Sequence, residues 1–257
     1  MLNKQYDDDF RLNSRKRLHE EFGNNKEEWN HWLFNHINIS NMNSVLEVGC
    51  GNGQLWIDNA KKIPNSTHIV LTDLSKGMVD IVNERIDSNN ITALEADACN
   101  LPFEDNSFDL VLASHMLYHV GDLDIALKEI TRVLKKDGVF IASGMGIQNF
   151  SEFIDFIEAN FLEIGYQEMQ NEILQKFNID DGENRLSSYF SKVDKIYYED
   201  FISVDQEEPL VNYILSLVKK ECLSSTYVKH VTKRVETLYK SQNEFRISKE
   251  VGILVSK

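Results

Sequence analysis

Short apolar runs alternate with longer amphipathic segments between residues 44 and 145. The runs have the length of strands and predict β-structure at 45–48, 68–72, 91–96, 108–113 and 139–142. Between them, apolar residues recur at intervals of three and four, which predicts one helix per connection, as at Leu123, Ala126, Leu127, Ile130, Val133 and Leu134. Strands joined by single helices form right-handed crossovers, so the pattern predicts an α/β fold with a mostly parallel sheet and helices on both faces.

Helix boundaries in this region follow from particular residues. The helix that begins after Gly53 is expected to run to about Lys62, and Lys136-Asp137-Gly138 is expected to end the helix before the fifth strand. The apolar face of the helix after the second strand is predicted to consist of Met78, Ile81, Val82 and Ile86.

Residues 1–40 are expected to be mostly helical, with Asn24 or Asn25 as the N-cap of one helix. A spacing of four residues predicts one buried face made of Trp29, Leu33 and Ile37. A second interpretation of this segment is that three of its side chains cover a pocket, namely Tyr6, Phe10 and His19.

Helical insertions are predicted at 146–192 and 205–243, with a strand at 193–204 between them and a last strand at 245–255. Ligands of open α/β sheets bind at the carboxyl ends of the strands, so the insertions are candidates for a substrate lid. Extra packing without ligand contact is the alternative. Since the chain has only 3 prolines and no Gly/Ser-rich linker, we expect one domain over 1–257 with a helical extension at 1–40.

The charge balance argues against some partners. The chain carries 41 acidic and 27 basic residues, a formal net charge of −14, so attraction to nucleic acid or to an anionic membrane is not expected unless a local basic patch exists. The basic residues come as scattered pairs that are typical of solvated faces.

Three cysteines, Cys50, Cys99 and Cys222, are widely separated, which fits reduced thiols and offers no metal-ligand spacing. The polar N-terminus lacks the pattern of a signal peptide, and no run approaches the ~18 apolar residues of a membrane span. We therefore expect a cytoplasmic protein without a metal site.

The chain is organised around a glycine turn after the first strand, which contains Glu47, Gly49, Cys50, Gly51 and Gly53. Glycine takes positive φ and lets a ligand lie against the backbone, so the turn predicts a site for a nucleotide-like ligand. Cys50 lies between two glycines where a small side chain is needed, which favours a packing role over that of a nucleophile.

Acidic residues stand at the ends of the first three strands: Glu47, Asp73 and Asp97. A carboxylate after the second strand, as Asp73 is, can accept hydrogen bonds from both hydroxyls of a ribose. The third glycine comes one residue too early for the dinucleotide fingerprint G-x-G-x-x-G, and an acid just before the turn suits a ligand with a cationic amino group better than a diphosphate.

These residues resemble the class I S-adenosylmethionine-dependent methyltransferases of the small-molecule type, related to the ubiquinone and menaquinone biosynthesis enzymes. The resemblance covers about residues 44–145. It rests on 47–53, on Asp73-Leu74-Ser75 with Met78, on Asp97-Ala98 followed by Leu101-Pro102-Phe103, on Ser107-Phe108-Asp109, and on Arg132-Val133-Leu134 before Gly138. The usual glycine pair before the fifth strand is Asp137-Gly138 here.

The resemblance implies a Rossmann-like sheet of seven strands, with the last antiparallel, and S-adenosyl-L-methionine as the cofactor. By similarity, Gly49, Gly51 and Gly53 lie against its methionine part, Asp73 holds the ribose hydroxyls, and Asp97 with Ala98 meets the adenine amino group. The candidate cofactor-binding residues also include Glu47, Cys50, Leu74, Met78 and Ser114.

Methyl transfer from a sulfonium is an in-line displacement, in which the protein mainly aligns the acceptor and excludes water. A base is needed only if the acceptor must lose a proton, and histidine can take one near neutral pH. The stretch after the fourth strand contains the candidate catalytic residues His115, Tyr118 and His119. Hydrogen bonding, packing or contact with the cofactor are the alternative roles for these three.

The residues thus predict methyl transfer to a small molecule that the sequence does not identify. A non-catalytic protein that binds S-adenosylmethionine remains an alternative, as does an NAD-dependent oxidoreductase, which the glycine spacing disfavours. Nucleic-acid methylation is disfavoured by the charge and by the absence of an Asn-Pro-Pro-Tyr type motif near the fourth strand. The oligomeric state is not predicted.

Overall fold

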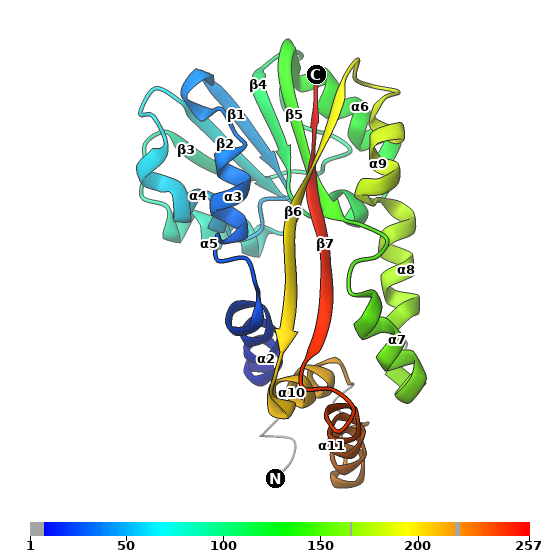
Figure 1. The fold of residues 1–257 in the computed structure, drawn as a ribbon. Helices are drawn as coiled ribbons and strands as arrows, with labels where there is room; N and C mark the ends of the chain where they lie inside the picture. The colour runs from blue at the N-terminus through cyan, green and yellow to red at the C-terminus, as the bar shows by residue number, and fades with distance from the viewer. Residues whose placement is uncertain (1–7, 165, 219–221) are drawn as a thin grey trace. The chain divides into compact units, whose positions relative to one another are not determined.

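The computed structural model describes residues 8–164, 166–218 and 222–257. Seven strands form one sheet in the order β3-β2-β1-β4-β5-β7-β6 (Figure 1). They are β1 (Ser44–Val48), β2 (His68–Asp73), β3 (Ile91–Glu95), β4 (Phe108–Ala113), β5 (Leu134–Met145), β6 (Val193–Val204) and β7 (Phe245–Ser256). Neighbours from β3 to β5 pair in parallel, and β7 pairs antiparallel with β5. The predicted Rossmann-like sheet with an antiparallel last strand is confirmed.

The chain divides into two compact units, and the boundary between them falls within both β6 and β7. The second unit comprises 27–147, 172–198 and 251–257 and contains β1 to β5. The first unit comprises 1–26, 148–171 and 199–250. Both predicted insertions contribute to the first unit, and their role as a lid stays a prediction.

Successive side chains of a strand point to opposite faces of the sheet, so the second unit has two apolar cores, one on each face. In β1, Leu46 and Val48 face a cluster with helix α6 (Leu123–Val133) and α9 (Ile179–Leu186). Val45 faces the other cluster, which contains α3 (Trp29–Asn35), α4 (Gln54–Asn59) and α5 (Lys76–Arg85). Each face of the sheet is therefore covered by helices, as the crossover rule requires.

The first unit has its own apolar core, to which residues of β6 and β7 also contribute. Its helices are α2 (Asp8–Phe22), α7 (Ser151–Asn160), α10 (Glu207–Leu217) and α11 (Ser225–Tyr239). Helix α8 (Tyr166–Lys176) spans the boundary between the units. Short 3-10 helices occur at Ile39–Asn41, Ala60–Lys62, Leu117–His119 and Leu162–Ile164.

Two predicted helix boundaries and one predicted helix face were wrong, for identifiable reasons. Helix α6 ends at Val133 and β5 begins at Leu134, before Lys136-Asp137-Gly138, because amides of the preceding loop, those of Asn106 and Ser107, bond to the last helical carbonyls. The buried face of α5 contains Val79 and Val82, whereas Met78 is 39% exposed and Ile81 is 37% exposed.

The expected N-cap at Asn24 or Asn25 is the third wrong prediction. The amide of Asn24 donates to the carbonyl of Phe201, and that of Asn25 donates to Asp200, so both asparagines bond to β6, while α3 begins after Glu28. In the predicted face of this segment, Leu33 and Ile37 are buried and Trp29 is half-buried. Of the three side chains expected to cover a pocket, Phe10 packs on the core of the first unit, the His19 ring lies 5.6 Å from that of Phe150, and Tyr6 lies outside the described residues.

Candidate functional site

The glycine turn after β1 has a backbone that only glycine adopts easily. Gly49, Gly51 and Gly53 have φ values of 69°, 54° and 72°. A Cβ on Gly49 would lie 2.8 Å from Met116, whereas a Cβ on Gly51 would meet no atom within 4 Å. The turn is therefore packed on one side by Met116 and open above Gly51, as a cradle for a ligand requires.

Asp73, at the end of β2, is bonded to this turn. Its Oδ2 accepts a hydrogen bond from the Gly51 amide at 2.9 Å, and its Oδ1 accepts one from the Ser75 amide at 2.8 Å. Two apolar side chains beside it are exposed, Leu74 by 69% and Met78 by 39%. A carboxylate between a glycine turn and exposed apolar side chains fits a nucleoside, whose ribose is polar and whose base is largely apolar on its faces.

Asp97 follows β3 at the same edge of the sheet. The Ala96 amide donates to the Asp73 carbonyl at 3.0 Å, which brings the end of β3 alongside Asp73. The Asp97 Oδ1 accepts from the Cys99 amide at 2.8 Å, and Ala98 is buried. Three of the predicted elements, the turn, Asp73 and Asp97, are therefore brought together.

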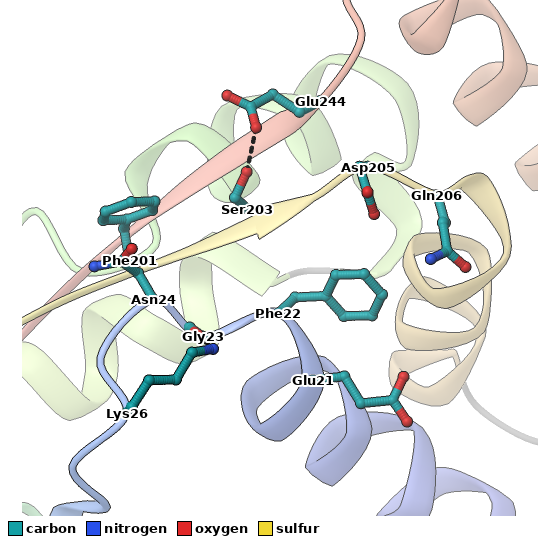
Figure 2. A pocket seen from close by; sticks show the side chains of 10 residues that line it. All are labelled: Glu21, Phe22, Gly23, Asn24, Lys26, Phe201, Ser203, Asp205, Gln206 and Glu244. Carbon is teal, nitrogen blue, oxygen red and sulfur yellow. Dashed lines mark hydrogen bonds between the residues drawn. The ribbon is translucent and has the colours of Figure 1, made fainter.

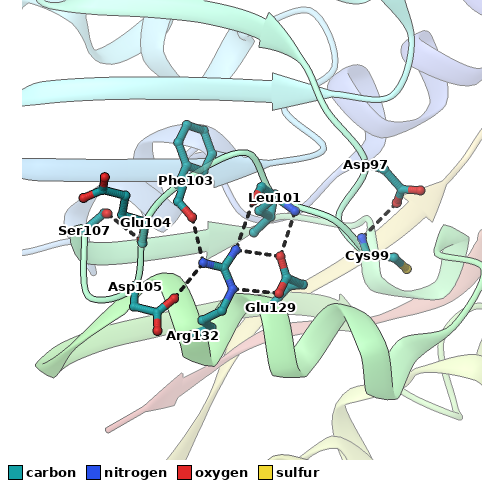
Figure 3. Close-up of polar contacts among 9 residues, drawn as sticks. All are labelled: Asp97, Cys99, Leu101, Phe103, Glu104, Asp105, Ser107, Glu129 and Arg132. Carbon is teal, nitrogen blue, oxygen red and sulfur yellow. Dashed lines mark hydrogen bonds and ion pairs between the residues drawn. The ribbon is translucent and has the colours of Figure 1, made fainter.

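The loop after Asp97 is held by Arg132, whose side chain had no predicted role (Figure 3). Its guanidinium donates to the carbonyl oxygens of Leu101 and Phe103 at 3.0 and 2.7 Å. It also binds Glu129 through two contacts of 2.7 Å, and Asp105 at 2.9 Å. The hydrogen bonds from Arg132 lower the pKa of Glu129, which in turn accepts from the Leu101 amide.

Glu47 lies two residues before Gly49 and is 3% exposed. Its Oε2 accepts a hydrogen bond of 2.6 Å from the indole nitrogen of Trp56, in α4. Burial raises the pKa of Glu47 to about 8, the Trp56 bond opposes this increase, and Asp73 adds to it. Burial also raises the pKa of the Cys50 thiol, which fits the predicted packing role of this residue.

The residues after β4 have different environments. His115 has a φ of 52°, and its amide donates to the buried Oγ of Ser143 at 2.9 Å. Its ring lies 5.0 Å from that of Trp29. Ser114 Oγ lies 3.2 Å from the same Ser143 oxygen.

Tyr118 is 8% exposed and lies in the apolar cluster that contains α6 and α9. Burial raises its pKa to about 12, so its phenol stays protonated near neutral pH. His119 is exposed, with its ring 4.6 Å from that of Tyr118. His115, next to Met116 and hence close to Gly49, is the best placed of the three candidates. Sequence reasoning missed Ser143, whose signal is a hydroxyl directly after the apolar run 139–142.

A separate cavity of about 540 Å³ lies in the first unit (Figure 2). Four of its charged and polar side chains have partners: Glu21 binds Arg17, Ser203 donates to Glu244 and Lys26 donates to the Gly23 carbonyl. None of the predicted site residues lines it. Across the described residues we find no cluster of three or more His, Cys, Asp or Glu side chains able to hold a metal, and no helix long and apolar enough to span a membrane.

Residues 46–142 match the family model described as a methyltransferase domain. The demethylmenaquinone methyltransferase of Staphylococcus saprophyticus is 32% identical over 114 residues, which cover 44% of this chain and 49% of the relative. The chain thus spans about half the length of the curated relatives it matches. The matched segment is thus similar to methyltransferase domains, in agreement with the resemblance found in the sequence.

Solved structures extend the fold similarity beyond this segment. The YcgJ protein of Bacillus subtilis, 14% identical, superposes with a TM-score of 0.57 over 88% of this chain and 96% of its own. A phosphoethanolamine N-methyltransferase of Haemonchus contortus, solved with phosphomonomethylethanolamine and S-adenosylhomocysteine, is 19% identical and gives a TM-score of 0.54 over 89% of this chain and 52% of its own. At these identities the two structures support the fold alone.

Proposed function

We propose that this protein transfers a methyl group from S-adenosylmethionine to a small-molecule acceptor. One observation carries the proposal: three glycines with positive φ form a turn that is open above Gly51, and the Asp73 carboxylate is bonded to that turn. The match of residues 46–142 to a methyltransferase domain supports the same reading.

The residues present fit the cofactor part by part. Gly51 leaves room for the methionine part, and the Glu47 carboxyl offers a counter-charge for its ammonium group. Asp73 has two oxygens for the ribose hydroxyls, and Leu74 and Met78 offer apolar contact to the adenine. Asp97 with Ala98 is proposed to receive the adenine amino group, and Cys50 and Ser114 to complete the contacts.

When bound, the cofactor supplies an activated methyl group on a positively charged sulfur. The protein then has to hold the acceptor in line with that group, and such alignment is worth up to ~7–11 kcal/mol. We assign the alignment, and any removal of an acceptor proton, to His115, because its left-handed backbone is fixed by Ser143 and its ring packs on Trp29. Tyr118 and His119 take supporting roles in this proposal.

Calorimetric titration of the full chain with S-adenosylmethionine and S-adenosylhomocysteine tests the proposal. We expect both to bind, and Asp73→Ala to weaken both by about tenfold or more, since the ribose loses hydrogen bonds to a charged group. Gly121→Ala serves as the control, since a Cβ there meets no atom within 4 Å. If the wild-type chain binds neither compound, the proposed function is wrong; if Asp73→Ala binds as wild type, only the ribose assignment is wrong.

The acceptor and the lid are further parts of the proposal. We propose that the two helical insertions, 146–192 and 205–243, cover the acceptor, and that no nucleic acid or membrane is involved. Three free cysteines support a cytoplasmic location. A screen of metabolites for transfer of a labelled methyl group identifies the acceptor class. Deletion of the insertions is not a suitable test, because both contribute residues to the apolar core of the first unit.

A further inference from the structure

The Glu47 carboxyl occupies an unusual place beside the proposed cofactor site. Glu47 lies on the strand face that packs on α4, where its Oε2 accepts the 2.6 Å bond from Trp56. Both side chains are buried, with 3% and 0% exposure. Among the described residues, we find no second donor on the carboxyl group and no cation paired with it.

The groups around Glu47 favour its neutral form. Asp73 on β2 and Cys50 in the turn are the ionisable groups that act on it, and both carry negative charge when they ionise. From β4, the residue paired with Glu47 is the apolar Leu112, and from α4 the contact is Trp56, which is uncharged. A buried carboxylate without a cation is unfavourable, so a cation that arrives at the turn changes the balance.

We propose that Trp56 is a positioning residue that holds Glu47 beside the glycine turn, and that Glu47 releases its proton when a ligand with an ammonium group binds there. This inference rests on the proposed function. The O–H bond of the Glu47 carboxyl breaks, the proton passes to the solvent, and the remaining carboxylate charge is balanced by the ammonium group. The Trp56 N–H bond then becomes charge-assisted and hence stronger.

The experiment measures protons released on binding. S-Adenosylhomocysteine is titrated into the full chain at pH 6 to 9, in pairs of buffers with different ionisation enthalpies. At pH 7 we expect close to one proton released per ligand bound, because Glu47 is largely protonated beforehand, with its pKa raised by burial to about 8. 5′-Methylthioadenosine, which lacks the amino-acid part, should release close to none.

Two substitutions separate positioning from packing. Trp56→Phe keeps the buried ring but removes the N–H, so the pH at which half a proton is released should rise by about one unit and the affinity at pH 7 should fall about tenfold. Trp32→Phe is the matched control, because Trp32 packs in the same core without bonding to Glu47, and it should leave proton release unchanged. Glu47→Gln should abolish proton release.

The outcomes are distinct. If S-adenosylhomocysteine binds but releases no proton at pH 7, or if Trp56→Phe behaves like Trp32→Phe, the inference is overturned while the proposed function stands. If Trp56→Phe does not fold, two comparisons of proton release still test the inference. One compares Glu47→Gln with wild type, and the other compares S-adenosylhomocysteine with 5′-methylthioadenosine. Failure of the wild-type chain to bind S-adenosylhomocysteine contradicts the proposed function itself.

Discussion

Replacing Arg132 by Met should loosen the loop that follows β3. The substitution keeps a long apolar stem but removes the guanidinium that binds the carbonyls of Leu101 and Phe103 and the carboxylates of Glu129 and Asp105. The loop then loses every side-chain bond that Arg132 gives it. Asp97 and Ala98, at its start, lose the support that fixes their position.

The magnitude follows from the contacts. The pair with Asp105 contributes about 0–1 kcal/mol, because Asp105 is 68% exposed. The two hydrogen bonds to carbonyl oxygens and the bidentate ion pair with Glu129 are better shielded from solvent. Together they contribute about 2–3 kcal/mol after allowance for the 31% exposure of the Arg132 side chain. We therefore expect Arg132→Met to cost about 3 kcal/mol, which lowers Tm by roughly 6–12 °C in a domain of this size.

Thermal and urea unfolding measure this cost, and calorimetry with S-adenosylhomocysteine measures its consequence for the proposed cofactor site, where we expect about tenfold weaker binding. Arg132→Lys keeps the charge without the planar fork and should lose about half as much stability. Lys128→Met removes a cation from the exposed side of the same helix and is the control. A loss below about 0.5 kcal/mol for Arg132→Met would refute the reasoning, because surface substitutions alone cause that much.

Three further predictions concern the turn. Gly51→Ala should cost about 1 kcal/mol of stability through its positive φ, yet lower S-adenosylhomocysteine affinity about 100-fold, since the new Cβ enters the open space above the turn. Glu47→Gln should remove a pH dependence: folding raises the Glu47 pKa from 4.5 to about 8, so wild-type stability should fall by about 4 kcal/mol as pH rises through this range, as measured by urea unfolding. At pH 8, iodoacetamide should modify the half-buried Cys50, whose thiol pKa is raised, at least about 100-fold more slowly than the exposed Cys222, as read by mass spectrometry of peptides.

Each of these three predictions would be contradicted by a particular result. Equal losses of affinity in Gly51→Ala and Gly121→Ala would show that the space above the turn is not used. A wild-type stability that stays constant or increases between pH 5 and 8 would contradict the buried neutral carboxyl. Modification of Cys50 and Cys222 at the same rate would contradict the raised pKa of the Cys50 thiol.

Much of the sheet could be predicted because the first three strands each combine an apolar run with a glycine or an acid at the end. Glu47, Asp73 and Asp97 were identified as the edge of a site for this reason. Helix faces were harder. In α5, apolar residues occur on more than one face of the helix. Val82 lies on the buried face, where the glycine turn packs against it so closely that a Cβ on Gly53 would lie only 3.2 Å away.

Partners distant in sequence could not be predicted. Arg132 bonds to backbone carbonyls 29 and 31 residues away, and backbone acceptors leave no trace in side-chain pattern. Ser143 supports His115 from the next strand, 28 residues later, and only the register of β4 against β5 brings them together. The positive φ of His115 is likewise a consequence of tertiary structure, since its residue type does not require it.

A crystal structure of the full chain with S-adenosylhomocysteine is the most direct test of the central claim. The claim predicts that the homocysteine part lies over Gly51, that both ribose hydroxyls donate to Asp73, and that the adenine lies between Met78 and the Asp97-Ala98 segment. Ligand density elsewhere, or a ribose that does not touch Asp73, would contradict it.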